Sequence, residues 1–150
     1  MATFRAAGEG DLSAIIALLA DDPLGRGRED ASDPPNTAYI SAFQAIVDDA
    51  NQLLAVADDG GVVGCMQISF IPGLSRLGMW RGQIESVRIA ASHRDAGLGR
   101  QFFEWAIERC RDRGCGLVQL TTDKTRSDAL RFYQSLGFAD SHTGMKLSLD

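Results

Sequence analysis

The chain has 150 residues, of which 45% are hydrophobic and 23% are charged, and its formal net charge is -5. This length supports one hydrophobic core, so we expect a single domain over residues 1–150. An acidic balance disfavours a broad nucleic-acid surface, because such a surface needs Lys and Arg gathered on one face. The longest clean apolar run near the start, at residues 14–20, is too short to cross a bilayer, and no secretory signal core is apparent. We therefore expect a cytoplasmic protein with neither a membrane nor a nucleic-acid partner.

The first half of the chain predicts two helices and a hairpin. Residues 4–6 are typical of a short strand, and apolar residues at helical spacing predict a helix that ends near Asp22. A loop rich in Gly, Pro and charge follows, and a second amphipathic helix is predicted over residues 37–49. Two strand-like runs at residues 53–57 and 62–70 are separated by D-D-G-G, which predicts an antiparallel hairpin because these residues tolerate positive φ.

The second half predicts a βαβ unit. A third strand is expected over residues 83–89 and a fourth over residues 117–121. Between them apolar residues recur every four positions from Leu98 to Cys110, and Gly114 stands where a helix would end. A strand, a helix and a strand in this order favour a parallel pair with a right-handed crossover.

The end of the chain predicts one more helix. It extends over residues 127–136, with Ser127 as its N-cap and Gly137 at its end. A short strand pair is expected in the tail, around Phe138 and residues 145–149.

The three cysteines are expected to be reduced and packed in the core. Cys65, Cys110 and Cys115 are an odd number, they lack the paired spacing of zinc sites, and the chain has only two histidines. We therefore expect no metal.

Residues 93–100 read H-R-D-A-G-L-G-R, directly between a predicted strand and a predicted helix. The first amides of a helix have no intrahelical partner and the helix dipole is positive there, so an anion fits. Gly97 and Gly99 lack Cβ atoms and allow a phosphate to approach, while Arg94 and Arg100 add local positive charge. The alternative is that the two glycines only form a tight turn. A dinucleotide fingerprint would need glycine at Phe102, and a P-loop would need a Gly-Lys-Ser or Gly-Lys-Thr sequence that the chain lacks.

Two segments resemble one known family. Arg94, Gly97 and Gly99 match the R/Q-x-x-G-x-G/A signature of the GNAT superfamily of acyl-CoA N-acyltransferases. Residues 127–138, S-D-A-L-R-F-Y-Q-S-L-G-F, are similar to that family's final helix, with Tyr133 ahead of the Leu-Gly-Phe ending. The resemblance extends over most of the chain from Leu53 onward and is nearest to small bacterial members.

The resemblance implies an α/β fold. The expected architecture is a mixed, mostly antiparallel sheet of about six to seven strands, flanked by about four helices, with the parallel βαβ unit at the cofactor site. It also implies acetyl-CoA as cosubstrate, with its pantetheine arm pairing to the backbone of Val87 and Ile89 and its pyrophosphate held by the amides of residues 95–100. The implied cofactor-binding residues are Val87, Arg88, Ile89, Arg94, Asp95, Ala96, Gly97, Leu98, Gly99, Arg100 and Arg126.

Two of these residues depart from the family pattern. Asp95 stands where glycine is usual, and its carboxylate would repel phosphate unless it points away. Arg126 stands where many members have asparagine, and it is a candidate for contact with a phosphate.

The resemblance implies an N-acetyltransferase that transfers the acetyl group of acetyl-CoA to a primary amine by direct attack in a ternary complex. The alternative is a non-catalytic acyl-CoA sensor or regulatory module. Tyr133 is the candidate proton donor to the leaving thiolate, since a phenol of pKa about 10 is protonated at neutral pH; the alternative is a tyrosine that only packs in the core. The oxyanion would be held by the backbone amide near Val87, which requires the strand to splay there.

Glu85 is the candidate base for the amine. Strand alternation predicts that it shares a face with Val87 and Ile89, where a carboxylate is costly to bury without purpose. The alternatives are an ordinary ion pair of Glu85 with Arg88 or Arg81, and a different base, either His142 or water.

The loop at residues 21–33 carries carboxylates that would suit a cationic amine, although a solvated loop of mixed charge is the alternative. The resemblance is also compatible with a homodimer.

Overall fold

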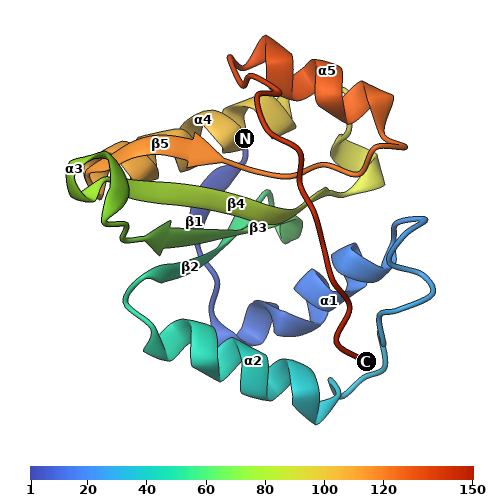
Figure 1. The fold of residues 1–150 in the computed structure, drawn as a ribbon. Helices are drawn as coiled ribbons and strands as arrows, with labels where there is room; N and C mark the ends of the chain where they lie inside the picture. The colour runs from blue at the N-terminus through green and yellow to red at the C-terminus, as the bar shows by residue number, and fades with distance from the viewer.

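The computed structural model describes residues 1–150. Its centre is one five-stranded sheet in the order β1-β2-β3-β4-β5. Figure 1 shows α4 and α5 above this sheet and α1 and α2 below it. The strands are β1 (Thr3–Ala6), β2 (Gln52–Asp58), β3 (Val62–Ile71), β4 (Trp80–Ile89) and β5 (Cys115–Gln119). The main helices are α1 (Leu12–Ala20), α2 (Thr37–Asp48), α4 (Leu98–Asp112) and α5 (Ser127–Ser135), joined by short turns at Glu9–Asp11, α3 (Ser75–Gly78) and Ala91–His93.

The topology confirms the predicted α/β class, but the sheet has five strands and not the predicted six to seven. Strands β1 to β4 are antiparallel neighbours, and β4 pairs with β5 in parallel after the crossover through α4. The D-D-G-G hairpin joins β2 to β3, and Gly60 and Gly61 have φ values of 71° and 154°. Glycine is the residue that enters this region without a steric penalty, which explains why the turn forms here.

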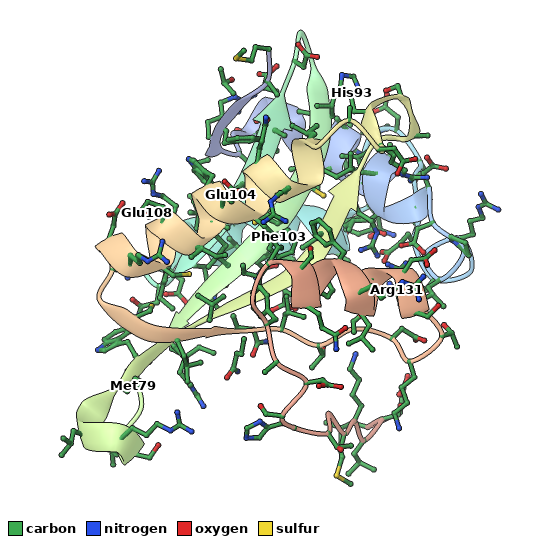
Figure 2. The ribbon with its side chains drawn as sticks, turned by 90° about the horizontal axis from the view of Figure 1, so that it is seen from above. Met79, His93, Phe103, Glu104, Glu108 and Arg131 are labelled. Carbon is green, nitrogen blue, oxygen red and sulfur yellow. The ribbon has the colours of Figure 1, made fainter.

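The sheet has an apolar core on each face. The larger core lies under α4 and α5, and its fully buried members include Met66, Ile68 and Phe102. Figure 2 shows Phe103 on the side of α4 that faces α5, where its ring packs edge-on against Phe132. A smaller cluster of Ile15, Val56 and Cys65 lies on the opposite face, between the sheet and α1.

The thiols are where composition predicted them. Cys65 and Cys110 are buried, Cys115 is partly buried, and all three are free. Burial raises the pKa of the Cys65 thiol to about 12, so this side chain behaves as a small apolar residue.

Two local predictions are wrong. The predicted strand pair in the tail is not formed, because residues 138–150 contain no strand and Met145, Leu147 and Leu149 are 90%, 85% and 94% exposed. Side chains that bury nothing cannot offset the entropy of ordering a strand. Ser127 is also not the N-cap of α5: Arg126 occupies that position and Ser127 is the first helical residue.

No helix is both long enough and apolar enough to span a membrane.

Candidate functional site

β4 changes its geometry halfway along its length. Its register with β3 moves from Gln67 opposite Glu85 to Cys65 opposite Arg88, so two residues of β4 lie against one residue of β3. Ser86, in this bulge, has a φ of 57°. A bulge increases local twist and bends the strand.

β4 and β5 then separate. Their parallel pairing ends where Gln83 faces Gln119, although β4 continues to Ile89. Residues 84–89 therefore have no strand on that side, as the proposed splay near Val87 requires. A free strand edge can accept an extended ligand as an added strand.

The bulge changes the face of the sheet on which residues beyond Ser86 lie, relative to Glu85. Because it inserts one residue, Glu85 shares its face with Arg88, whereas Val87 and Ile89 pack on the core under α4. The prediction that Glu85 lies on the same face as Val87 and Ile89 is wrong. Glu85 is also exposed, and Arg88 pairs with another carboxylate, so neither the buried carboxylate nor the ion pair with Arg88 is found.

The N-terminus of α4 lies just beyond the end of β4. Gly97 is its N-cap with a φ of 82°, a left-handed conformation that favours glycine. The first amide bonded within the helix is that of Gln101, which donates to the Gly97 carbonyl at 3.2 Å. The amides of residues 98–100 therefore point out of the helix end with no intrahelical partner.

Gly99 lies inside the first turn of α4, where no special conformation requires glycine. A Cβ there would lie 3.8 Å from Phe132 and 3.9 Å from Ile89, which is ordinary contact. The fold therefore does not explain this glycine, which costs about 1 kcal/mol relative to alanine in a helix.

The charged residues of this turn are only partly available to a ligand. Arg94 donates from Nε to the Ile89 carbonyl at 3.0 Å, and Arg100 pairs with Glu104 one turn along α4 at 3.2 Å. Asp95 is exposed and has a φ of 63°.

A buried carboxylate joins three parts of the chain. Asp22 is the second residue after α1, and its side chain is only 4% exposed. It lies 2.7 Å from Arg88 of β4 and 2.8 Å from Arg126 at the start of α5. The Arg126 contact is a hydrogen bond. The Arg88 Nε contact is close but poorly aligned, so its attraction is electrostatic.

The pKa of Asp22 is lowered. Burial alone would raise it, but the Leu24 amide, the hydrogen bond from Arg126 and the charges of Arg88 and Arg126 outweigh burial. The carboxylate is therefore ionised at neutral pH.

This cluster forms one wall of a cavity of about 520 Å³. The cavity is lined by Asp21, Asp22, Pro23, Arg26, Val87, Arg88, Ile89, Ala91, Arg94 and Arg126. Four arginines against two aspartates make it locally positive in an acidic chain. Five predicted cofactor residues (Val87, Arg88, Ile89, Arg94 and Arg126) meet here, whereas residues 95–100 do not line it.

Arginine side chains cover the two β4 carbonyls predicted to pair with pantetheine. Arg88 donates from Nη1 to the Val87 carbonyl at 2.9 Å, and Arg94 holds the Ile89 carbonyl. An added strand at these carbonyls must replace both bonds.

Tyr133 lies on α5 and is partly buried. Its ring packs against Phe103 with centroids 5.4 Å apart and against Phe138 at 6.1 Å. Burial raises its pKa, against the opposing effect of the charges of Arg126 and Arg88. The ring thus packs against the core, and the raised pKa leaves the phenol protonated at neutral pH.

The other candidate side chains are used locally. His142 is exposed in the tail, with its Nδ1 2.6 Å from Ser141 Oγ. In the loop at residues 21–33, Glu29 accepts a hydrogen bond from the Tyr39 hydroxyl at 2.9 Å, and Asp30 accepts one from the Ser32 amide at 3.0 Å.

The role of Asp22 was not predicted from the sequence. This residue is one of several carboxylates in the loop at residues 21–33, but it alone is buried between two arginines. No sequence signal separates Asp22 from Asp21, which follows the apolar helix directly and is exposed.

Comparison with known proteins identifies the family. A model of the acetyltransferase (GNAT) family matches residues 12–138. The chain belongs to the GNAT acetyltransferase family. This agrees with the match of Arg94, Gly97 and Gly99 to the GNAT signature.

Two characterised relatives of this GNAT chain are acetyltransferases. It is 28% identical over 130 residues to streptothricin acetyltransferase from Streptomyces lavendulae, covering 87% of this chain and 65% of that protein. It is 32% identical over 106 residues to aminoalkylphosphonate N-acetyltransferase from Salmonella typhimurium strain LT2, covering 70% of this chain and 68% of that protein. The chain thus spans about two thirds of the length of these relatives.

The crystal structure of a transcriptional regulator from Bacillus halodurans C-125 has the same fold. It is 49% identical to this chain, has a TM-score of 0.97, and the match covers 99% of this chain and 100% of that one. GNAT proteins use acetyl-CoA.

Proposed function

We propose that this protein is an acetyl-CoA-dependent N-acetyltransferase acting on a primary amine of a small molecule or peptide by direct attack in a ternary complex. The observation that carries the proposal is the separation of β4 from β5 beyond Gln83, beside the N-terminus of α4. This arrangement offers a free strand edge for an extended arm and unpartnered amides for a phosphate.

The residues of the cavity and of the α4 N-terminus would together hold acetyl-CoA. The β4 edge at Val87 and Ile89 would pair with the pantetheine arm, and the amides of residues 95–100 would hold the pyrophosphate. Arg88 and Arg94 would leave the two carbonyls they cover, and Arg94 would turn toward the phosphates. Arg126 would contribute positive charge while remaining bonded to Asp22. When bound, acetyl-CoA supplies an activated acetyl thioester and a thiol leaving group.

The chain itself would supply the proton transfers. Tyr133 has a raised pKa and would donate a proton to the leaving sulfur. The backbone amide near Val87 would hydrogen-bond the developing oxyanion. Glu85 would take the proton of the amine, since the bulge directs it to the face opposite the α4 core; His142 and water are the alternative bases.

The relatives support a small-molecule acceptor. By their names, one acts on streptothricin and the other on aminoalkylphosphonates. Small amines reached from the open side of β4 are therefore the first class to test.

A second candidate function is acyl-CoA sensing without turnover. The 49% identity to a protein described as a transcriptional regulator favours it. Tyr133→Phe separates the two functions: an enzyme loses acetyl transfer while its affinity for acetyl-CoA is kept, whereas a sensor shows no thiol release with any amine before or after the change.

The main experiment is a thiol-release screen with acetyl-CoA against polyamines, amino sugars, aminoglycosides, amino acids and peptides. Gly97→Glu is its companion variant, because it brings bulk and negative charge to the α4 N-terminus. Calorimetric titration should show loss of acetyl-CoA binding, and circular dichroism should show a retained fold. Unchanged affinity in Gly97→Glu would refute the phosphate site.

A further inference from the structure

A row of polar side chains crosses the sheet on the face opposite α4. We call it the polar row, and it comprises Gln52 of β2, Gln67 and Ser69 of β3, Gln83 of β4 and Gln119 of β5. The strand register places all five on one face, because Gln52 and Gln83 both lie opposite Ser69, and Gln83 lies opposite Gln119. The four glutamines are half-buried and Ser69 is 8% exposed.

The members of the polar row bond to one another but leave half of their amide capacity free. Gln67 Nε2 and Ser69 Oγ both donate to Gln52 Oε1 at 2.9 Å. Gln119 Nε2 donates to Gln83 Oε1, also at 2.9 Å. Each glutamine thus uses one end of its amide in a hydrogen bond to a neighbour. The other ends, two NH₂ groups on Gln52 and Gln83 and two carbonyl oxygens on Gln67 and Gln119, have no partner within the chain.

None of these free amide ends is sealed from solvent. The buried side-chain atoms that lack a hydrogen-bond partner are the Nε atoms of Arg81 and Arg88 alone. A ligand lying on the sheet can therefore reach the free donors and acceptors of the polar row.

The polar row ends at the proposed reaction site. Gln83 and Gln119 form the last pair before β4 and β5 separate. Glu85 lies on the same face of β4 and is opposite Gln67. It is two residues beyond Gln83, which is about 7 Å along a strand.

We propose that the polar row is the acceptor subsite and that the acceptor is a hydroxyl-rich amine of the amino-sugar class. This inference rests on the proposed acetyltransferase function. A hydroxyl both donates and accepts, so a run of hydroxyls matches a surface that presents uncharged donors and acceptors together. An anionic acceptor would use only the NH₂ groups, and a polyamine would use only the carbonyl oxygens.

The size of the polar row favours a ligand of two rings. Neighbouring strands lie about 4.8 Å apart, so β2 to β5 span about 14 Å. A disaccharide covers this length, with its amine directed to Glu85 and the end of the polar row.

The geometry disfavours a peptide acceptor, and an apolar amine would leave the free amides of the polar row without partners. A peptide would bind through its main chain to a free strand edge, but the row runs across strands whose facing edges are paired with each other. An apolar amine would enter the neighbouring cavity of about 150 Å³, which ten hydrophobic residues line and which only Gln67 and Ser86 connect to the polar face. That cavity supplies no partner for the free amides.

The test compares acceptors in the thiol-release assay. The probes are glucosamine, a diamino disaccharide, hexylamine and a lysine-containing peptide. We expect kcat/KM to be highest for the disaccharide and at least about tenfold higher for glucosamine than for hexylamine, as one or two additional hydrogen bonds provide.

The variant Gln83→Leu/Gln119→Leu removes both partners of one bond, so it leaves no unpaired amide behind. We expect KM for the disaccharide to rise about tenfold or more, which exceeds any rise in KM for hexylamine, and calorimetric acetyl-CoA affinity to stay unchanged. Gln44→Leu, an exposed glutamine on α2, is the control and should change none of these.

Faster acetylation of hexylamine or of the peptide than of either sugar would overturn the inference and leave the acetyltransferase function standing. An unchanged KM in the double variant would also overturn it. Acetyl-CoA binding without thiol release from any amine would instead refute the function itself.

Discussion

Replacement of Gly99 by alanine separates the requirements of folding from those of the cofactor. Gly99 lies in the first turn of α4, and an added Cβ would make ordinary contacts with Phe132 and Ile89 at 3.8 and 3.9 Å. Folding should therefore benefit from the higher helix propensity of alanine, by about 0.5 to 1 kcal/mol. For a chain of this size we expect the melting temperature to rise by about 1 to 4 °C.

The same methyl group should weaken cofactor binding. It would lie between the free end of β4 and α5, where the proposed phosphate site needs close approach to the helix amides. We expect the acetyl-CoA Kd measured by calorimetry to rise about tenfold, which corresponds to about 1.4 kcal/mol. Stability and affinity should thus move in opposite directions.

Gly114→Ala is the matched control. Gly114 has a φ of 77° and open space around its Cβ position, so alanine there should lower stability by about 1 kcal/mol and leave the Kd unchanged. A Gly99→Ala protein that is more stable and binds acetyl-CoA as tightly as the original would refute the close-approach argument. A Gly99→Ala protein that is less stable than the original would refute the inference that a Cβ at Gly99 makes only ordinary contacts.

Four further predictions address other parts of the fold. Asp22→Asn should lower the free energy of unfolding in urea at pH 7 by about 2 to 3 kcal/mol, since Arg88 loses its partner while Arg126 can turn to solvent. Because the folded pKa of Asp22 is lowered, its contribution to stability is complete above about pH 4 and is lost as the pH falls through that lowered pKa. A stability difference between the two proteins that does not decrease as the pH falls below about 4 would contradict the ion-pair assignment. Gly82→Ala should destabilise the fold by about 1 to 3 kcal/mol, because its Cβ would lie 2.3 Å from Cys110 Sγ. Adding Cys110→Ala to this variant should recover part of the lost stability in thermal melts. If no stability is recovered, the clash is not with Cys110. Tyr133→Phe should lower kcat about 100-fold without changing acetyl-CoA affinity, and full activity would return Tyr133 to a packing role. Cys65 should not react with a disulfide reagent at pH 8 until the protein unfolds, given a pKa of about 12; rapid reaction in the folded state would show that its pocket opens.

Helix and strand periodicity was sufficient to predict most of the fold. The repeat from Leu98 to Cys110 identified α4, and its place between two strands predicted the parallel pair β4 and β5, which the structure confirms. Turn chemistry did the same for the hairpin at Gly60 and Gly61. These signals are local, so a sequence carries them directly.

Predictions that assumed regular geometry failed where the chain is irregular. Alternation placed Glu85 with Val87, but the bulge at Ser86 reverses the faces beyond it. A bulge depends on how two strands pair with each other. The residues around Ser86 include no turn residue that would predict it. The tail at residues 145–149 alternates like a strand, yet it has no partner to pair with.

The sequence by itself determined the family, the class of fold and the turn before α4, because each depends on residue types at short spacing. Only the tertiary structure decided which distant side chains meet. Asp22 and Arg126 are 104 positions apart. The polar row consists of side chains from four strands that lie on one face of the sheet. Such contacts arise from the packing of whole elements, and no local pattern in the chain contains them.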